Sequence, residues 1–499
     1  MVPPIRSGAE LLEQSAWAAE IPGLVEQTRQ WLVGLPIERR RLLREARGLA
    51  MPALHPAGIG RLFAMAGKVI GQASAWGTVD LGRAVWRAIV YGEDDDGERV
   101  KAAVARAERL VREAGPVYVK LGQFISTAQG LLPDEVVEAF AWCRDEVPPI
   151  PTPVARGIVE RDLGRPIDAV FESFGDFPLA SASIAQVHAA RLRDGTEVVV
   201  KVRRPGLRRQ FEADVRAMAL LAAFGERRSS AVRAANARGF VELFAQLVLE
   251  EMDFRLEALN MIEIGLASED AGILDALRVP RPIPDLVTRR VLVMEYLPGR
   301  RYTDAAGQLE PGVDPAQLIR VGIQGVLEHT LVYGIFHGDL HAGNVFLEPD
   351  GRYALLDFGI VGRLDADQRA ALVRFMIGVG TFDARAQLEG LVQFGAIPPD
   401  TDLDQLVAEL EALGPQPDVV THDQMVDDMA QTMRLLVARG FRLPKELVLF
   451  FKNLLYLNGL AAILAPDLNL LGEVDPIFQY FAAKYETEIS VFGPPASKP

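Results

Sequence analysis

Two polar motifs in the second half of the chain constrain its fold more than any other feature: FHGDLHAGN at residues 336–344, and Asp357-Phe358-Gly359. Asp339 lies eighteen residues before Asp357 and five before Asn344. Phosphoryl transfer needs a carboxylate that orients the acceptor and oxygen ligands for the magnesium ion on the phosphates. Asp339 has the residue type for the first task, and Asn344 and Asp357 have the types for the second. The spacing therefore predicts a magnesium–phosphate site.

The segments around these motifs predict a framework of short strands. Val345-Phe346-Leu347 and the apolar run at 353–356 are typical of a hairpin that turns at Asp350-Gly351. The offset from Asp339 to Asn344 matches the catalytic loop of protein kinases. A surface loop, in which Asp, Asn and Gly only form turns, is the alternative. The complete set of residues favours the C-terminal lobe (C-lobe) of a kinase-like fold.

The composition is that of a globular chain with an acidic balance. Hydrophobic residues make up 49% of the 499 residues and charged residues 24%, and the formal net charge is −14. This charge argues against a nucleic-acid partner, although the arginine cluster at 39–47 could contact anionic lipid. Cys143 is the single cysteine, so no intramolecular disulfide or cysteine metal cluster can form. We therefore expect a reducing compartment.

The sequence predicts neither an exported chain nor a membrane span. The N-terminus MVPPIRSGAELLEQ lacks the basic-then-apolar layout of a signal peptide. The longest apolar candidate, residues 447–465, contains Lys452, Asn453 and Asn458, which favours a buried helix. We expect a cytoplasmic protein whose membrane contact, if it has one, is peripheral and at the inner face.

The first 97 residues are predicted to form a helical extension without a catalytic motif. Within it, residues 61–91 combine Trp76, Trp86 and Phe63 with basic side chains. An interfacial membrane helix has this pattern, but a helix that docks onto a core is the favoured interpretation, because amphipathicity mostly marks a core-facing stripe. The charged turn at 93–97 marks the end of the extension.

The rest of the chain divides into four predicted segments. A helical segment at 98–164 contains Lys120-Leu121-Gly122-Gln123. It is followed by an N-terminal lobe (N-lobe) at 165–299 and by the C-lobe at 300–488, which is helical by pattern after residue 366. Residues 489–499 are predicted to be a disordered tail.

The predicted N-lobe contains a hairpin with an unusual lysine. Asp168 to Phe174 is a candidate first strand, and residues 186–192 and 197–202 flank the turn Asp194-Gly195. Lys201 lies inside the second strand of this hairpin. A buried lysine is costly unless it is paired, and in kinases the lysine of this strand holds the α- and β-phosphates. A lysine that points to solvent is the alternative.

Two further N-lobe segments are typical of nucleotide binding. Residues 178–185 lie where kinases have a glycine-rich phosphate loop, but they contain no glycine, which should change the nucleotide pose. The apolar strand at 290–299 matches a kinase hinge. Backbone groups of Glu295 to Leu297 would bond adenine there, and Met294 would line the adenine pocket.

Four motifs together resemble one family. KLGQ at 120–123, the Ala-rich loop at Ala180, HGDLHAGN and DFG are similar to the UbiB family of atypical protein-kinase-like proteins, the aarF-domain kinases of ubiquinone biosynthesis. The resemblance covers roughly residues 98–465, and it is the combination of motifs that is specific. It implies an α+β, bilobed, protein-kinase-like fold with a helical KxGQ extension and a helix-rich C-lobe.

The resemblance also implies roles for individual residues and the bound groups. The family's motif EMDFRLEA makes Glu251 the first choice, and Glu257 the second, for the carboxylate that pairs with Lys201. Lys120 could engage one of these glutamates, and Lys120 and Gln123 would occlude or tune the nucleotide site. The Ala-rich loop falls on Ala180, Ser181, Ala182 and Ser183. The implied partners are ATP or ADP with Mg²⁺ and a lipid or isoprenoid-quinone precursor.

We expect a division of labour among the site residues. Lys201, oriented by Glu251, would hold the α- and β-phosphates, and Asp357 and Asn344 would bind magnesium. Asp339 would position the attacking water or hydroxyl.

Histidines and a glycine set this catalytic loop apart from ordinary kinases. Gly338 replaces the arginine that reads a phosphorylated activation loop, and His341 replaces the lysine two residues after the catalytic aspartate. No Ala-Pro-Glu sequence follows Asp357. We therefore expect neither control by activation-loop phosphorylation nor ordinary peptide docking. His337 would support the loop by a hydrogen bond; His337 and His341 could instead be zinc ligands, but the neighbouring carboxylates favour magnesium.

Three functions remain open from the sequence. The first is a UbiB-like atypical kinase or ATPase that supports lipid or isoprenoid-quinone metabolism. The second is a small-molecule phosphotransferase of the aminoglycoside and choline kinase type, which HGDLHAGN also resembles. The third is a nucleotide-binding scaffold without catalysis. KLGQ before the N-lobe favours the first function over the second, and the intact set of Lys201, Asp339, Asn344 and Asp357 disfavours the third.

Overall fold

The structure is a computed structural model, and its described parts cover most of both lobes. They are residues 6–62, 115–126, 148–228, 237–305, 309–380, 383–412, 444–466 and 474–484, with single residues at 140, 143, 435, 436, 439, 441 and 468. Nearly all of the 61–91 segment, the turn at 93–97 and the tail at 489–499 lie outside the described residues. Their predicted structures stay predictions.

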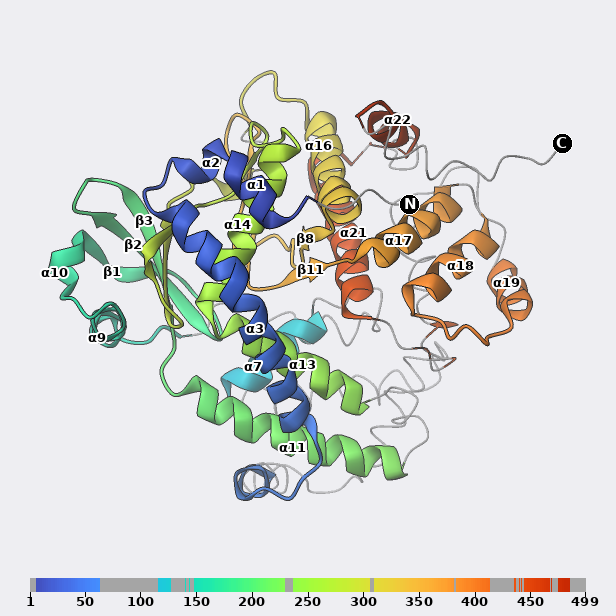
Figure 1. The fold of residues 1–499 in the computed structure, drawn as a ribbon, viewed down its shortest axis with the longest axis horizontal. Helices are drawn as coiled ribbons and strands as arrows, with labels where there is room; N and C mark the ends of the chain where they lie inside the picture. Colours follow the sequence, from blue (N-terminus) through green and yellow to red (C-terminus); the bar gives the residue numbers. More distant parts are fainter. Residues whose placement is uncertain are drawn as a thin grey trace.

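A five-stranded antiparallel sheet forms the N-lobe, with strand order β1-β2-β3-β6-β5. Figure 1 shows this sheet at one end of the molecule and the C-lobe helices at the other. The hairpin predicted around Asp194-Gly195 is confirmed as β2 and β3. The strands are β1 (Phe171–Ser181), β2 (Ala185–Leu192), β3 (Glu197–Arg203), β5 (Pro282–Val287) and β6 (Val291–Glu295).

Alternation along β3 decides which face of the sheet carries Lys201. Val198, Val200 and Val202 are buried against helix α9 (Thr152–Leu163) and the short helix α10 (Ile167–Val170). Side chains alternate between the two faces of a strand, so Lys201 points to the opposite face. That face packs on helix α14 (Phe254–Asp270). The lysine is therefore aimed at the helix that can supply its carboxylate.

Two predicted elements have different boundaries in the structure. The strand predicted from Asp168 begins only at Phe171, because Ile167 and Val170 are buried one helical turn apart in α10. The single helix predicted at 240–260 is two helices, α13 (Ala237–Glu251) and α14. Asp253 ends the run: its side chain accepts a hydrogen bond from the Arg255 N–H and caps the N-terminus of α14.

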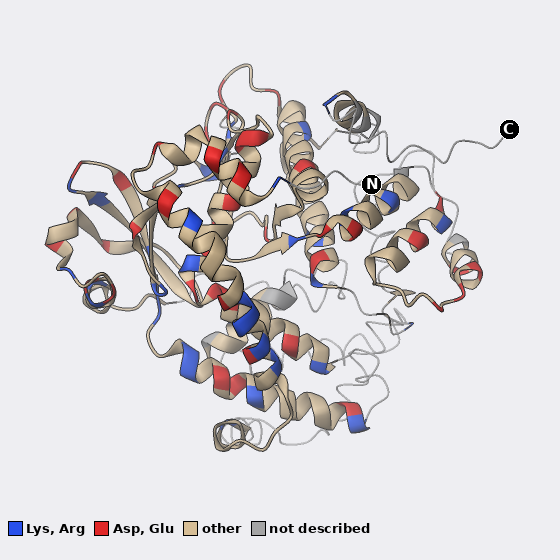
Figure 2. Cartoon of the chain, viewed as in Figure 1, with Lys and Arg blue, Asp and Glu red and all other residues tan. Residues whose placement is uncertain are grey.

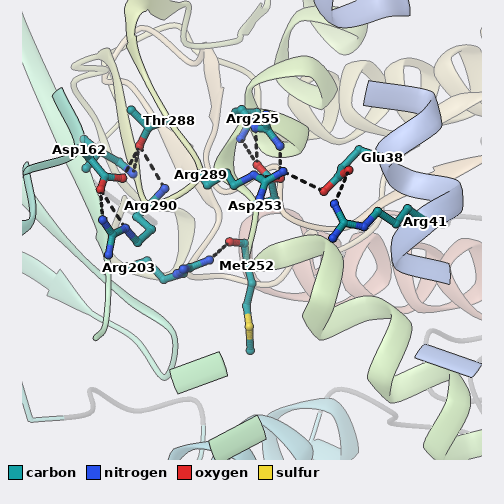
Figure 3. A network of polar contacts seen from close by, with 11 residues as sticks. Glu38, Arg41, Asp162, Arg203, Met252, Asp253, Arg255, Thr288, Arg289 and Arg290 are labelled. Atoms are coloured by element: carbon teal, nitrogen blue, oxygen red, sulfur yellow. Dashed lines mark hydrogen bonds and ion pairs between the residues drawn. The ribbon is translucent and has the colours of Figure 1, made fainter. Parts of the chain in front are cut away.

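The N-terminal helices pack against the helices of the N-lobe. Helix α3 (Leu24–Ala50) runs across α13 and α14, and α11 (Leu207–Arg228) packs beside it (Figure 1). Figure 3 shows how Glu38 of α3 contacts Arg289, which also lies 3.6 Å from the capping Asp253. Helices α1 (Gly8–Gln14) and α2 (Ala16–Ala19) precede α3 and also contact α14. The extension is thus packed against the α13–α14 junction.

The C-lobe combines two small sheets with helices. The predicted hairpin at Asp350-Gly351 is confirmed as β9 (Val345–Leu347) and β10 (Tyr353–Leu355). It lies in a four-stranded sheet with β4 (Leu277–Arg278) and β7 (Arg300–Arg301). Strands β8 (Ile335–His337) and β11 (Val361–Arg363) form a second, two-stranded sheet. The helices are α15 (Tyr302–Ala305), α16 (Pro315–Glu328), α17 (Ala366–Gly380), α18 (Ala384–Phe394), α19 (Leu403–Glu411), α21 (Lys445–Leu464) and α22 (Val474–Lys484).

Helix α21 is the segment with the strongest apolar character in the described chain. Among the described residues it is the one helix long and apolar enough to cross a membrane, but 61% of its most apolar window is buried inside the protein. Phe450 and Phe451 pack in the C-lobe core, and Lys452, Asn453 and Asn458 are also buried. The prediction of a buried helix agrees with this packing.

A buried histidine lies just before the catalytic loop. Helix α16 continues into a π-helical turn, η3 (His329–Tyr333), which leads to β8. The His329 side chain is 4% exposed, and its Nε2 lies 3.0 Å from the Ser268 Oγ. Burial lowers the pKa of His329 to about 4. The folded protein thus holds this imidazole neutral.

Replacing His329 should reduce the acid sensitivity of the fold. The unfolded state protonates a histidine near pH 6.5, whereas the folded state resists protonation until about pH 4. The stability that this group contributes is therefore complete above pH 6.5 and is lost as the pH falls toward 4. In urea unfolding, wild-type protein should lose about 2–3 kcal/mol more than His329→Gln between pH 7 and pH 4.5. The exposed His55 gives the control His55→Gln, and equal losses in His329→Gln and wild type would contradict the assignment.

Candidate active site

The site lies where the two lobes meet, and Lys201 is at its centre. Lys201 Nζ is 2.7 Å from Glu257 Oε1 and 3.2 Å from Asp357 Oδ2. Burial lowers the pKa of Lys201, but Asp357 and Glu257 raise it more, and the net pKa lies above its usual range. Burial conversely raises the pKa of Glu257 to about 7 despite the attraction of Lys201. Lys201 is thus a buried, charged group that links β3, α14 and the DFG segment.

Glu257, not Glu251, is the partner of Lys201. The prediction that Glu251 forms this ion pair is wrong, because the chain breaks between α13 and α14 and the two glutamates belong to different helices. Glu251 instead binds Lys120, with 2.7 Å between Nζ and Oε2. The second-choice partner and the suggested engagement of Lys120 are therefore confirmed as contacts.

The KLGQ segment forms helix α7 (Pro116–Ser126) and contacts the Ala-rich loop. The Ser183 hydroxyl donates to Gln123 Oε1 at 3.0 Å, and Gln123 Nε2 donates to the Cys143 carbonyl at 2.8 Å. Gly122 is required in this packing, since a Cβ there would lie 2.3 Å from Cys143 Sγ. The helix predicted to regulate the site is thus held against its phosphate-loop region.

Ala180 and Ser181 are the last residues of β1, and Ala182 and Ser183 lie in the short loop that connects β1 to β2. Its turn is closed by a hydrogen bond from the Ala182 N–H to the Ala185 carbonyl. The side chain of Arg204 donates to the Ala182 carbonyl and to the Ser181 hydroxyl, at 2.9 and 2.8 Å. Both serine hydroxyls of the loop are therefore engaged within the protein, and Ser183 is 1% exposed.

The catalytic loop is fixed by its own histidine and asparagine. His337 Nδ1 accepts from the Asp339 N–H at 3.1 Å, and His337 Nε2 lies 3.2 Å from the Leu356 carbonyl. This arrangement agrees with the predicted supporting role of His337. The Asn344 amide donates to the Asp339 carbonyl at 3.0 Å. Close packing accounts for the glycine at position 338, since a Cβ there would lie 2.8 Å from the side chain of Ile360.

Asp339 is ionised in this environment. Burial raises the pKa of its carboxyl, but Lys452 and then His341 lower it more, so the net pKa lies well below its usual range. Lys452 Nζ is 2.8 Å from Asp339 Oδ1, and His341 Nε2 is 3.7 Å from Oδ2. Lys120 adds a weaker attraction, which places its charge near the loop as well.

The DFG segment is held in a turn that few residues adopt. Asp357 has φ +56°, and among the described residues it is the only one other than glycine with positive φ. Its Oδ1 accepts from the Gly359 N–H at 3.1 Å. Burial raises the pKa of the Asp357 carboxyl, but Lys201 and Lys120 lower it more, and the net pKa falls below its usual range. Asp357 is thus a half-exposed carboxylate beside two ammonium groups.

A hydrogen-bond chain connects the DFG backbone to the N-terminal extension. Asn260 of α14 donates to the Phe358 carbonyl at 2.7 Å. Its Oδ1 accepts from Arg39 of α3 at 2.9 Å and from Arg363 of β11 at 2.8 Å. Sequence reasoning missed Asn260 and Arg39. A polar side chain within the long apolar stretch of α14 was the available signal, because such a group needs partners when it is buried.

Sequence reasoning also missed the contribution of α21. In the sequence, Lys452 and Asn453 indicate only that the apolar segment is not a membrane span. Lys452 binds Asp339, and the Asn453 amide donates to the His337 carbonyl. Lysine is almost never fully buried without a partner. A lysine in the middle of a core helix therefore signalled a carboxylate elsewhere.

Two backbone hydrogen bonds narrow the hinge prediction. Met294 lies opposite Val199, on the same face of the sheet as Lys201, where it can line an adenine pocket. The N–H groups of Glu295 and Tyr296 are already used, since they donate to the Arg281 and Glu197 carbonyls at 3.0 and 3.2 Å. Among the backbone groups predicted to bond adenine at Glu295 to Leu297, these two N–H groups are therefore engaged within the protein, and the Leu297 N–H is the one proposed as a donor to adenine.

The oxygen donors in the cleft suit a magnesium ion. The Asn344 amide nitrogen binds the Asp339 carbonyl, which leaves Asn344 Oδ1 for a cation. The Leu356 N–H donates to the Asn344 carbonyl at 2.8 Å and so keeps Asn344 next to Asp357. Glu251 Oε1 and Glu257 Oε2 are buried oxygens without a hydrogen-bond partner in the described chain. Asn344 Oδ1 and the Asp357 carboxylate are ligands of the kind that a hard cation prefers, and among the described residues no group of three or more His, Cys, Asp or Glu side chains is placed to hold a metal ion by itself.

Comparison with known proteins identifies the family. The protein-family model described as "ABC1 atypical kinase-like domain" matches residues 143–390 of the sequence. An uncharacterized aarF domain-containing protein kinase of Arabidopsis thaliana, named as chloroplastic, is 34% identical over 73% of this chain and 72% of its own length. An alignment with a Marinobacter nauticus protein named "Probable protein kinase UbiB" is 32% identical and covers 76% and 71% of the two chains. The chain belongs to the ABC1 (aarF/UbiB) family of atypical kinases.

The family assignment confirms the resemblance drawn from the motifs. An uncharacterized Mycobacterium tuberculosis protein is also similar, at 35% identity over 76% of this chain and 78% of that protein. The expected fold class, an α+β bilobed kinase-like fold with a helix-rich C-lobe, holds for this ABC1 protein. The domain boundaries and the roles of the individual site residues remain proposals.

Proposed function

We propose that this ABC1 protein binds MgATP and transfers its terminal phosphoryl group, with slow hydrolysis when no acceptor is bound. The observation that carries the proposal is the contact of Lys201 with both Glu257 and Asp357, at 2.7 and 3.2 Å. A kinase site needs the strand lysine, its helix glutamate and the DFG aspartate in place together. The catalytic-loop aspartate, Asp339, belongs to the same group of charges, since Lys120 lowers the pKa of both the Asp339 and the Asp357 carboxyls.

Each residue then has a distinct task. Lys201, held by Glu257, binds the α- and β-phosphates. Asp357 and Asn344 hold the magnesium ion, which neutralises charge on the phosphates when it is bound. Asp339, ionised and fixed by His337, orients the water or hydroxyl that attacks.

Helix α7 is proposed to gate this site. The Lys120–Glu251 ion pair and the Gln123–Ser183 hydrogen bond fasten α7 to α13 and to the Ala-rich loop. In kinases the corresponding loop closes over the phosphates. A loop fastened to α7 is restrained from closing, so turnover should be slow while these contacts persist. Because this loop would contact the phosphates, the same restraint should also affect the relative affinity of the site for ATP and ADP.

The proposed setting is lipid or isoprenoid-quinone metabolism at a membrane surface. Family members named UbiB support this setting, since that name refers to ubiquinone biosynthesis. One face of α3 exposes Val33 and Ile37 together with Arg40 and Arg44, which have no ion-pair partner in the described chain. Figure 2 shows basic positions on the later turns of α3 and on the adjacent α11. A basic face with exposed apolar side chains suits an anionic lipid surface.

A small-molecule phosphotransferase is the second candidate. The catalytic aspartate and asparagine suit both functions, so the contact of α7 with the Ala-rich loop is the feature that favours the first. A screen that detects rapid phosphorylation of a soluble alcohol would favour the second. The third candidate, a nucleotide-binding scaffold without catalysis, is disfavoured because such a protein has no need of an ionised carboxylate at Asp339.

Replacing the DFG aspartate should abolish metal-dependent nucleotide binding. Asp357→Asn removes one of two proposed magnesium ligands, so we expect the Kd for MgATP to rise at least about tenfold and phosphate release to fall about 100-fold. Titration calorimetry and a phosphate-release assay measure the two effects. Asp350→Asn, in the exposed β9–β10 turn, is the control. Unchanged MgATP affinity in a folded Asp357→Asn protein would refute the metal assignment.

Releasing α7 should speed turnover. Lys120→Ala and Gln123→Ala each remove one of the contacts that fasten α7, and we expect phosphate release to increase several-fold in both. Steady-state assays with ATP and with competing ADP would also show a changed nucleotide preference. If both variants kept wild-type turnover and nucleotide affinities, α7 would not be a gate.

Anionic membranes should stimulate the protein through α3. We expect vesicles with about one-third phosphatidylglycerol to increase phosphate release and to co-sediment the protein, whereas neutral vesicles should do neither. Arg40→Glu with Arg44→Glu should remove both effects. Arg374→Glu with Arg385→Glu, on exposed C-lobe positions, is the charge-matched control. Equal binding to both kinds of vesicle would argue against an electrostatic membrane contact.

A further inference from the structure

Lys452 is a buried lysine that the division of labour above does not use. It lies in the middle of α21, where it is 7% exposed between apolar neighbours of the C-lobe core. Its Nζ is 2.8 Å from Asp339 Oδ1 and 5.5 Å from the centre of the Tyr456 ring. A buried ammonium group without compensation is strongly destabilising, and the carboxylate of Asp339 supplies that compensation.

The catalytic loop itself lacks a lysine near Asp339. Ordinary kinase loops have one two residues after the aspartate, where this chain has His341. His341 faces the other carboxylate oxygen, with 3.7 Å between Nε2 and Oδ2, and its Nδ1 accepts from the Gly343 N–H at 2.9 Å. The nearer cation to Asp339 therefore comes from α21, 113 residues later in the chain.

The register of α21 against the loop is fixed by the next residue. The Asn453 amide donates to the carbonyl of His337, whose ring accepts from the N–H of Asp339. Lys452 thus contacts the side chain of Asp339, and Asn453 contacts the backbone of the same loop at His337. A helix that served only to fill the core would need neither polar group.

We propose that Lys452 is the positioning residue for Asp339 and replaces, from a distant helix, the lysine that the catalytic loop lacks. The proposal rests on the phosphoryl transfer proposed above. Lysine has three N–H donors, of which the Asp339 contact uses one. The charge of Lys452 holds Asp339 Oδ1, so that Oδ2 is turned toward the acceptor. It also places a positive charge where the transferring phosphoryl group meets Asp339.

Helix α21 provides a matched pair for the test. Lys445 lies at the start of the same helix and pairs with the partly buried Glu250 at 3.4 Å. This ion pair also joins α21 to another element, α13, but it lies outside the proposed site. Lys452→Met and Lys445→Met therefore remove the same charge from the same helix, and only the first should change the reaction.

The experiment is a double-variant cycle on phosphate release from γ-labelled ATP, with the MgATP Kd measured separately by calorimetry. We expect Lys452→Met to lower kcat about 100-fold and to change the Kd by less than about threefold. Lys445→Met should retain wild-type kcat. Asp339→Asn with Lys452→Met should be no slower than Asp339→Asn alone, because Lys452 acts through Asp339.

Each other outcome refutes a defined claim. A wild-type kcat in Lys452→Met would overturn the role of Lys452 and leave the proposed function intact. The same holds if the kcat of the double variant fell by the product of the reductions in the two single variants. Absence of phosphate release from wild-type protein would refute the proposed function itself. If Lys452→Met did not fold, the double variant, which removes both charges of the pair, would be compared with Asp339→Asn alone. Equal rates would then support the proposal, and a further loss would overturn it.

Discussion

Charge compensation in a buried cleft is the constraint on which the rest of the structure depends. Lys120, Lys201 and Lys452 are each paired with a carboxylate at 2.7–2.8 Å. Removing one partner of such a pair leaves an uncompensated charge, which costs about 3–5 kcal/mol. These pairs join α7 to α13, β3 to α14, and α21 to the catalytic loop, so the two members of each couple cannot shift apart without leaving a charge unpaired. The site is therefore also a structural junction.

The break between α13 and α14 gives this junction its specificity. Asp253 caps the second helix, and the two glutamates on either side of the break serve different lysines. The same helix, α14, carries Asn260, which binds the Phe358 carbonyl and receives Arg39 from the N-terminal extension. One helix thus connects the strand lysine, the DFG backbone and α3. A displacement of α3 would act on all of them through α14.

Much of this arrangement could be predicted from the sequence, because local patterns determine it. The β2–β3 hairpin follows from Asp194-Gly195 between apolar strands, and the spacing of HGDLHAGN and DFG predicted a kinase-like C-lobe. The partner of Lys201 could not be predicted, since Glu251 and Glu257 are both helical acids and only the position of the break separates them. The partner of Lys452 could not be predicted for a different reason: the residues near a core lysine in the sequence do not indicate which carboxylate it contacts in the fold. Long-range pairing of charges is a property of the tertiary fold, whereas strand and turn signals are properties of short segments.

The position of α21 near the end of the chain has a consequence for biosynthesis. Lys120 and Lys452 belong to one cleft, yet a ribosome that has synthesised the catalytic loop and the DFG segment still has about a hundred residues to add before α21 emerges. Domains fold as they are synthesised, at roughly 5–20 residues per second, so the catalytic loop spends several seconds without the helix that compensates Asp339. During that interval the nascent chain has a kinase-like sequence but an incomplete site. A chain truncated before residue 452 would therefore carry every recognisable kinase motif but lack the cation beside its catalytic aspartate.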